Sequence, residues 1–203
     1  MKKIGLLGGT FNPIHNGHLL LAQTALEQCD LDEMWILPSG ISYMKKGMAI
    51  PDGETRGKMA ELAIEGLERF HVCDLEIKTE GNTYTANTLI ELRRIYPDHW
   101  FYFIIGGDSL AALPSWYHPE MIMENCTLVV GQRDADDDQK IRELGDNVII
   151  RFGGKIIYLK FPDTPISSSE IRKKLQFGES VDGLVPAGVL SYIREHHMYE
   201  DVE

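Results

Sequence analysis

Residues 8–18 read Gly8-Gly9-Thr10-Phe11-Asn12-Pro13-Ile14-His15-Asn16-Gly17-His18, and the rest of the chain is best interpreted from this stretch. A short apolar run at 2–7 leads into it, and a helical pattern of apolar residues from Leu19 to Leu26 leads out of it. This order predicts a strand, a tight loop and a helix. The glycines let the loop turn sharply and let its backbone approach a ligand closely.

The start of that helix is suited to binding an anion. Its first N–H groups lack helical partners and lie at the positive end of the helix dipole. His15 and His18 carry imidazoles that can donate hydrogen bonds to phosphate oxygens. The loop matches neither the P-loop nor the G-x-G-x-x-G dinucleotide fingerprint. The histidines could instead cap or pack the helix, but H-x-G-H in a first strand–helix unit favours a phosphate site.

Composition sets broad limits on fold and function. The chain has 203 residues and 43% hydrophobic residues, which suits a single domain over 1–203 with a C-terminal helical part at about 164–200. The net charge of −11 argues against broad nucleic-acid binding, so an anionic nucleotide must meet cations gathered locally.

No apolar run approaches the roughly 20 residues of a membrane span, and Met1-Lys2-Lys3 does not resemble a signal peptide. Cys29, Cys73 and Cys126 are far apart and odd in number, which suggests neither a zinc site nor a disulfide framework. We therefore expect a protein without a membrane partner, in the reducing cytoplasm.

Strand and helix patterns alternate along the chain. They predict an α/β fold with a doubly wound, mostly parallel, Rossmann-like sheet and helices on both faces. The expected strands after the first are at 34–37, 71–77, 100–105, 127–130, 148–150 and 156–159, and the expected helices include 54–70, 86–96, 109–113 and 186–197.

Several candidate ligand contacts follow the expected strands, where open α/β sheets bind ligands. Gly106-Gly107-Asp108 follows the 100–105 strand, and Asp108 could hold a ribose or cap the next helix. Arg133 follows the 127–130 strand and could meet a phosphate or the adenine side of a nucleotide. Lys45 lies in the loop after the 34–37 strand, where a solvated basic loop is the plainer interpretation.

Two further segments have both a structural and a ligand interpretation. Thr85 or Thr83 could cap the helix at 86–96, while the N–H groups at that helix start could also face an anion. Trp116-Tyr117 could cover the core or meet an aromatic ligand.

The run Ile166-Ser167-Ser168-Ser169-Glu170-Ile171-Arg172 predicts a capped helix start. Its hydroxyls, the helix N-terminus and Arg172 would also suit a polyphosphate. The acidic run at 134–138 lacks the spacing of a calcium loop and fits a solvated helix start.

The two conspicuous segments resemble the two signatures of the nucleotidylyltransferase superfamily. His15-Asn16-Gly17-His18 is similar to its H-x-G-H, and the I-S-S-S-x-I-R run at 166–172 is similar to its second signature. The full form at 8–18 is most similar to the bacterial nicotinate mononucleotide adenylyltransferases. The resemblance covers essentially the whole chain and implies transfer of the adenylyl group of ATP to nicotinate mononucleotide, in NAD biosynthesis.

The resemblance also implies roles for individual residues. The catalytic set would be His15, His18 and Arg172. The ATP site would add Gly8, Gly9, Thr10, Phe11, Gly106, Asp108, Arg133, Ile166, Ser167 and Ser168. Nicotinate mononucleotide would meet Asn12, Lys45, Thr85, Trp116 and Tyr117. Tyr43-Met44-Lys45 stands where the family has Pro-His-Lys, so the lysine is kept and the histidine is not. Mg²⁺ would bridge ATP oxygens without a carboxylate cage in the protein, and a homo-oligomer stays open.

Three other functions are compatible with parts of the sequence but are less favoured than adenylyl transfer to nicotinate mononucleotide. Phosphopantetheine or glycerol-phosphate nucleotidyl transfer is the nearest rival, and Tyr84-Thr85 with Trp116 favours the nicotinate substrate. A non-catalytic ATP-binding module on the same scaffold is disfavoured by the intact His15, His18 and Arg172. A nicotinamide-dependent dehydrogenase is disfavoured by the missing glycine fingerprint.

Overall fold

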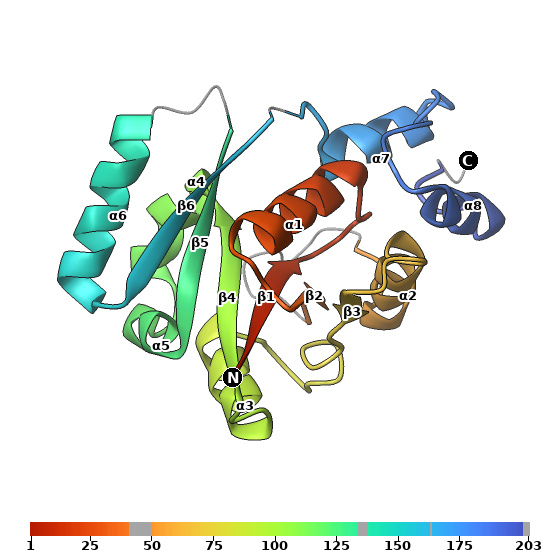
Figure 1. The fold of residues 1–203 in the computed structure, drawn as a ribbon. Helices are drawn as coiled ribbons and strands as arrows, with labels where there is room; N and C mark the ends of the chain where they lie inside the picture. The colour runs from red at the N-terminus through yellow and green to blue at the C-terminus, as the bar shows by residue number, and fades with distance from the viewer. Residues whose placement is uncertain (41–49, 134–137, 163, 201–203) are drawn as a thin grey trace.

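The computed structural model describes residues 1–40, 50–133, 138–162 and 164–200, with only the backbone of Arg133. In this part of the chain six strands form one sheet in the order β3-β2-β1-β4-β5-β6, and every neighbouring pair is parallel (Figure 1). The strands are β1 (Lys2–Gly9), β2 (Glu33–Pro38), β3 (Phe70–Val72), β4 (His99–Gly106), β5 (Cys126–Arg133) and β6 (Lys155–Phe161). The predicted doubly wound α/β fold is confirmed.

Helices cover both faces of the sheet. They are α1 (Asn16–Gln28), α2 (Gly53–Ala63), α3 (Thr85–Ile95), α4 (Gly107–Ala112), α5 (Pro119–Asn125), α6 (Asp138–Phe152), α7 (Ser168–Gln176) and α8 (Ala187–Glu195), with a 3₁₀ turn, η2, at Leu113–Ser115. One buried cluster joins the sheet to α1, α2, α7 and α8, and a second joins it to α3, α4, α5 and α6. Within the described residues, none of the helices is long and apolar enough to cross a bilayer.

The strand order places the ligand-binding end of the sheet. β1 lies at the centre, with β2 on one side and β4 on the other. The chain first adds β2 and β3 on one side of β1, then crosses back and adds β4, β5 and β6 on the other side. Ligands of such sheets bind outside the carboxyl ends of the strands at this switch point. The loop after β1 and the start of α4 after β4 therefore border the expected site.

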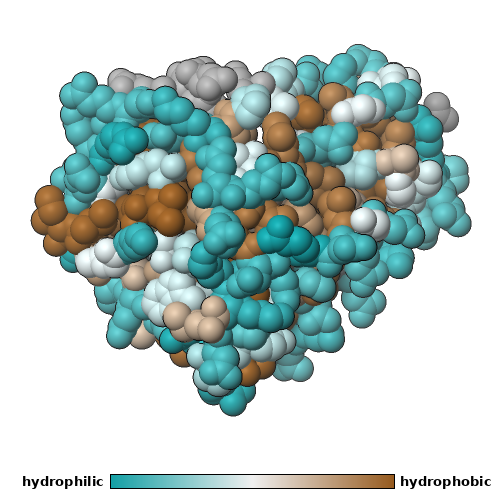
Figure 2. All heavy atoms as spheres, viewed as in Figure 1, coloured by the Kyte–Doolittle hydropathy of each residue, from teal (hydrophilic) through white to brown (hydrophobic). Residues whose placement is uncertain are grey.

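One predicted strand is wrong. Val148, Ile149 and Ile150, expected as a strand, lie in helix α6. Ile141 and Val148 face the core from two turns of that helix, whereas Ile150 is 83% exposed. Figure 2 shows apolar surface over this part of the molecule. A run of β-branched residues favours a strand only weakly, and here the helical spacing of the buried positions prevails.

Several boundaries also differ from the prediction. The helix expected at 54–70 ends at Ala63, and Gly66 follows with a φ of 82°. The strand expected at 71–77 is only Phe70–Val72, because the chain turns at Asp74, whose carbonyl accepts from the N–H of Lys78. Neither threonine caps α3: its N-cap is Tyr84, which makes no side-chain capping bond.

Candidate active site

The loop after β1 has a tightly constrained backbone. Phe11 is 2% exposed and adopts a φ of 51°, and the Asn12–Pro13 peptide bond is cis. A Cβ placed on Gly9 would lie 2.8 Å from the Phe11 ring, so a larger residue would collide with it. Gly17 has a similar role, because a Cβ there would lie 3.1 Å from His15 Nδ1. The glycines of the motif thus allow two rings to pack against the backbone.

Side chains from two helices cover the carbonyl oxygens of this loop. Arg56 of α2 donates to the Thr10 carbonyl at 2.9 Å, and Arg172 of α7 donates to the Asn12 carbonyl at 2.7 Å. Neither guanidinium forms an ion pair with a carboxylate in the described part of the chain, although Arg56 is only 4% exposed. Burial lowers the pKa of Arg56 from its usual range. Two cations therefore stand beside the loop.

The start of α7 touches the same loop. Ser168 donates its hydroxyl to the Pro13 carbonyl at 2.9 Å, across 155 residues of sequence. Ser169, one position on, accepts from Arg172 at 3.2 Å. The segments at 8–18 and 166–172 are thus in direct contact, as their common interpretation as phosphate-binding segments requires.

The two histidines of the motif stack on each other. Their ring centroids lie 3.6 Å apart with 25° between the planes, and the edge of Phe11 packs against His18. The N–H of His15 donates to Nδ1 of His18 at 3.2 Å. A neutral imidazole that accepts at Nδ1 carries its proton on Nε2, so His18 is held as a hydrogen-bond donor at Nε2.

Both imidazoles are neutral in this environment. Burial lowers the pKa of His15 to about 4, and burial, with the neighbouring His15 as a smaller cause, lowers the pKa of His18 well below its usual value. His15 Nδ1 is buried and has no hydrogen-bond partner among the residues that the structure describes. The pair can therefore donate hydrogen bonds at neutral pH without gaining a positive charge.

Two cavities meet at Thr10. The first, of about 280 Å³, is lined by Gly8, Gly9, Thr10, Leu37, Ser39, Glu76, Thr83, Tyr84, Thr85, Phe103, Ser109, Trp116, Tyr117 and Ile122. The second, of about 180 Å³, is lined by Thr10, Phe11, Asn12, His18, Ile50, Ser168, Ser169 and Arg172. The first is aromatic, whereas the second presents hydroxyls, an imidazole and a guanidinium. Such a pair suits a ring at one end and phosphates at the other.

A buried carboxylate shapes the first cavity. Glu76 accepts from the Thr88 hydroxyl at 2.8 Å and the Thr83 hydroxyl at 3.0 Å, and from the Gly40 N–H at 3.3 Å. These bonds join the end of β2, the turn before α3 and α3 itself. Both carboxylate oxygens are therefore already engaged by the protein.

Comparison with known proteins identifies the family. The model of the cytidylyltransferase-like family matches residues 6–174. A curated relative from Lachnoclostridium phytofermentans, named as a probable nicotinate-nucleotide adenylyltransferase, is 45% identical over 98% of this chain and 100% of its own. A relative of the same name from Dehalococcoides mccartyi is 42% identical over 97% of both chains. The chain belongs to the nicotinate-nucleotide adenylyltransferase family.

Solved structures agree on the fold. The nicotinic acid mononucleotide adenylyltransferase of Plasmodium falciparum, complexed with APC, superposes with a TM-score of 0.78 at 21% identity and 98% coverage of both chains. The same enzyme complexed with NaAD gives a TM-score of 0.79 at 20% identity. At such identities the likeness concerns the fold.

The structure brings most of the residues expected from the family resemblance to the two cavities, although not always as expected. Asn12, expected with the mononucleotide, lines the second cavity beside His18 and Arg172. His15 lines neither cavity and lies behind His18. Ser167 is the N-cap of α7, where its hydroxyl accepts from the N–H of Glu170 at 3.2 Å.

The other expected residues lie at the margins of the site. Gly106 and Asp108 begin α4 at the end of β4, and Asp108 is exposed and is not the N-cap. Ile166 packs beside the helix start of the motif, near Gly17. Lys45 and the side chain of Arg133 lie outside the described residues.

Sequence reasoning missed several residues of the site. Arg56 stands out only as a basic residue in the first turn of a helix, and Glu76 was placed in a strand. Tyr199, whose hydroxyl donates to Asn12 Oδ1 at 2.6 Å, lies far from either motif. Nothing in the local pattern could have connected these residues, because each reaches the site through tertiary packing.

The lowered pKa of His15 makes stability depend on pH. Below pH 6.5 the unfolded chain binds a proton at this histidine that the folded chain refuses until about pH 4, so the free energy of unfolding falls as the pH falls. The expected loss from His15 is about 3 kcal/mol over this range, with about 2 kcal/mol of it by pH 5. Urea unfolding of the ligand-free protein between pH 7 and 5 measures it.

A matched pair of variants checks the assignment. His15→Gln should reduce this pH dependence by the share of His15 even if its absolute stability changes, while the share of His18, whose pKa is also lowered by burial, remains. His196→Gln, which alters an exposed histidine just after α8, should keep the dependence of the unsubstituted protein. An unchanged slope in His15→Gln would contradict the assignment to this ring.

Proposed function

We propose that the chain performs its family's reaction in these two cavities, transferring the adenylyl group of ATP to nicotinate mononucleotide and releasing pyrophosphate and nicotinate adenine dinucleotide. The polyphosphate would occupy the second cavity and the mononucleotide the first. The observation that carries this proposal is the contact between the two motif segments, through Ser168 with Pro13 and Arg172 with Asn12. Together they make one donor-rich pocket at the switch point of the sheet.

The chemistry explains why the pocket contains so few charged groups. The attacking group is a phosphate that is already an anion at neutral pH, so no strong general base is needed. The barrier lies in bringing two anions together and in stabilising charge on the α-phosphate and the leaving pyrophosphate. Positioning and fixed donors lower such a barrier. No carboxylate is among the described residues that line the second cavity.

Different residues of the two motifs would contact different phosphates of ATP. We place His18 against the α-phosphate, because its Nε2 is held as a donor and its ring lines the second cavity. His15 would support it from behind through the stacked rings. Ser168 and Arg172 would hold the β- and γ-phosphates at the N-terminus of α7, where the helix dipole favours anions. Thr10 and Phe11 would border the same phosphates.

The nucleoside of ATP would lie toward the ends of β4 and β5. Gly106 and Asp108 are at the end of β4, and the exposed Asp108 carboxylate could accept from ribose hydroxyls. Arg133 ends β5 on the neighbouring strand. Ile166 and Ser167 would close the nucleoside side from the start of α7. The position of these residues at adjacent strand ends supports the assignment.

Nicotinate mononucleotide would enter the aromatic cavity. Trp116 and Tyr117 offer ring faces there, and Thr85 begins α3, so its N–H has no helical partner. Gly8 and Gly9 line the side nearest β1. Asn12 would lie between the two substrates, and Lys45 would act from the adjoining loop.

Mg²⁺ would arrive with ATP and stay bound to it. The described residues include no group of three or more histidine, cysteine or acidic residues that could hold a metal, and the donors lining the second cavity suit phosphate oxygens rather than a cation. Mg²⁺ often keeps several waters and relies on substrate phosphates. When bound, it would neutralise part of the phosphate charge.

Two broader properties complete the proposal. The 203 residues would act as one catalytic domain, because α7 and α8, from the C-terminal part, share a buried cluster with α1 and α2. The protein would work in the cytoplasm, in keeping with Cys29, Cys73 and Cys126, which are free.

A pyrophosphate assay tests the function. Purified protein with ATP and Mg²⁺ should release pyrophosphate when nicotinate mononucleotide is added, and the dinucleotide should be found by mass spectrometry. Phosphopantetheine and glycerol phosphate serve as competing acceptors. Release with one of these and none with nicotinate mononucleotide would move the chain to a different reaction of the superfamily.

Arg172→Lys tests the polyphosphate site. Lysine keeps the charge but lacks the planar fork, and it loses the bond that covers the Asn12 carbonyl. We expect kcat/KM for ATP to fall by roughly 10–100-fold, the scale of one lost charged hydrogen bond. The thermal midpoint should change by only a few degrees. A collapse in melting temperature with unchanged ATP affinity in the folded fraction would make Arg172 structural.

A further inference from the structure

The C-terminal tail reaches back to the first motif. Tyr199, three residues after the C-cap of α8, donates its hydroxyl to Asn12 Oδ1 at 2.6 Å, across 187 residues of sequence. Its ring packs against the buried cluster on the α1 face, and its backbone has a φ of 66°. The family model ends at residue 174, so Tyr199 lies outside the part of the chain that the model matches, whereas Asn12 lies inside it.

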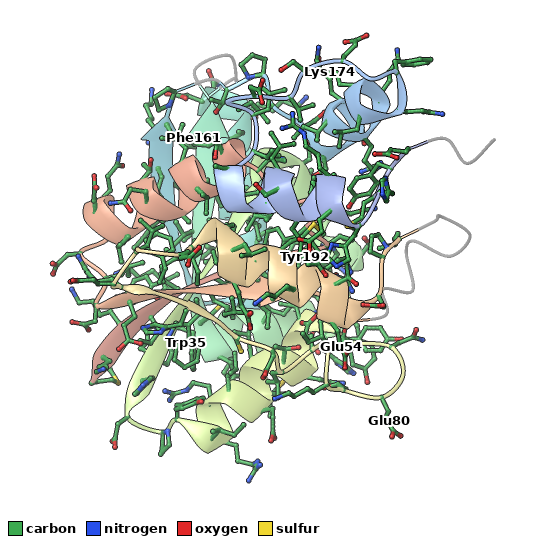
Figure 3. The ribbon with its side chains drawn as sticks, turned by 90° about the vertical axis from the view of Figure 1, so that its right-hand side faces the viewer. Trp35, Glu54, Glu80, Phe161, Lys174 and Tyr192 are labelled. Carbon is green, nitrogen blue, oxygen red and sulfur yellow. The ribbon has the colours of Figure 1, made fainter. Side chains whose placement is uncertain are left out.

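The segment that leads to the tail is anchored at two places, by the packing of α8 on α2 and by a hydrogen bond from Asn16 to the chain just before α8. Figure 3 shows α8, which carries Tyr192, lying over α2, which begins beside Glu54. Val189 and Ile193 of α8 are buried in the cluster shared with α2. Just before α8, the Gly183 carbonyl accepts from the Asn16 side chain at 2.8 Å. These contacts fix the segment that leads to Tyr199.

The surroundings of Tyr199 decide which partner donates. Arg172 and Arg56 are the charged groups that act on its hydroxyl. Burial raises the pKa of Tyr199 well above its usual value, so the hydroxyl keeps its proton and can donate. Asn12 accepts at both of its carbonyl oxygens, from Tyr199 at the side chain and from Arg172 at the backbone. What Asn12 has left to offer a ligand is the pair of hydrogens on Nδ2.

We propose that Tyr199 is a positioning residue for adenylyl transfer: it holds Asn12 Oδ1 so that Nδ2 presents its hydrogens to the polyphosphate in the second cavity. Asn12 lines that cavity beside His18, Ser168 and Arg172. The assignment of polyphosphate to this cavity rests on the proposed function.

The orientation of the Asn12 amide matters because its oxygen only accepts hydrogen bonds and its NH₂ group only donates them. An amide turned by 180° would direct a lone pair at an anion that can only accept hydrogen bonds. The Tyr199 hydroxyl favours the observed orientation, in which it donates to Oδ1 at 2.6 Å; against a turned amide it would have to rotate its proton away and accept from the NH₂ group instead. Without the hydroxyl both orientations become accessible, and the fraction that binds phosphate falls.

Tyr199→Phe removes only the hydroxyl. We expect KM for ATP to rise and kcat/KM for ATP to fall by about tenfold, the upper scale of one neutral hydrogen bond. KM for nicotinate mononucleotide should change by less than about twofold, and the thermal midpoint should stay within a few degrees. Tyr192→Phe is the matched control, because Tyr192 lies in the same region and its ring packs on His196.

A double-mutant cycle separates positioning from general support. If Tyr199 acts through Asn12, the Tyr199→Phe substitution should cost little more in an Asn12→Ala background, whereas independent effects would add. The cycle is measured both in kcat/KM for ATP and in the affinity of a non-hydrolysable ATP analogue by calorimetry. The second readout does not require turnover.

The outcomes distinguish this inference from the proposed function. Unchanged kinetics and analogue affinity in Tyr199→Phe, or additive losses in the cycle, would overturn the role of Tyr199 while leaving the reaction intact. A fall in kcat with an unchanged KM for ATP and a much lower melting temperature would also overturn it, as a structural role. Absence of turnover in the unsubstituted protein, with analogue binding still weakened about tenfold by Tyr199→Phe, would instead overturn the reaction.

Discussion

Replacing His18 by alanine should lower kcat by about 10²–10³-fold, the scale of losing one preorganised donor to a developing negative charge. The reason is local: the His15 N–H occupies Nδ1 of His18 and leaves Nε2 as the donor at the second cavity. The affinity for ATP should fall less, because Arg172 and the start of α7 still hold the other phosphates. Single-turnover rates with saturating ATP measure the effect.

Two variants control this prediction. His18→Gln places an amide NH₂ close to the position of Nε2 and should recover part of the lost rate, which loss of packing alone would not allow. His71→Ala, at an exposed position in β3, should leave kcat unchanged. Near-normal turnover in His18→Ala would mean that this imidazole does not contact the reacting phosphate.

The acid nicotinate mononucleotide should be used in strong preference to its amide, nicotinamide mononucleotide. The ring faces of Trp116 and Tyr117 would stack on either pyridine, because stacking does not distinguish the substituent. Backbone N–H groups at Thr85 and Tyr117 are donors, which match a carboxylate but leave one side of an amide unpaired. One unpaired buried group costs about 1–3 kcal/mol, and a charge-assisted bond is lost as well. We expect a ratio of at least tenfold and up to about 10³ in kcat/KM.

Glu76 makes this a demanding test. It is a carboxylate in the wall of the cavity that would receive the carboxylate of nicotinate, and an amide would suit it better if its oxygens were available. They are engaged by Thr83, Thr88 and Gly40 instead. Steady-state rates with both mononucleotides at equal ATP decide the matter. Equal efficiencies would show that the pocket does not distinguish the carboxylate from the amide, and a preference for the amide would show that the N–H groups do not select the substrate.

The fold could be predicted where the local sequence pattern and the tertiary packing favour the same secondary-structure element. The central strand at 100–105 is nearly continuous in apolar residues and is buried in the sheet as β4. The 148–150 run shows the limit: its β-branched residues suit a strand, but Ile141 and Val148 are buried from one face of a helix. The intrinsic secondary-structure preference of residues 148–150 could not show which part of the fold would pack against them.

The site could be predicted from the two motifs, because the chemistry of phosphate binding restricts residue types and spacing there. The family resemblance supplied the roles that spacing alone could not. What could not be predicted are single residues brought in by tertiary packing. Glu76 lines the first cavity, and Arg56 and Tyr199 bond to the loop after β1. All three come from elements with no ligand signature of their own.

The contacts of Ser168, Arg172 and Tyr199 with residues 12 and 13 have a consequence for protein synthesis. The ribosome makes residues 12 and 13 of the phosphate loop between 155 and 187 residues before these three partners. Contacts so distant in sequence close late in folding. A nascent chain therefore lacks these contacts until residues 168–199 have emerged, and we expect it to reach its full affinity for ATP only then.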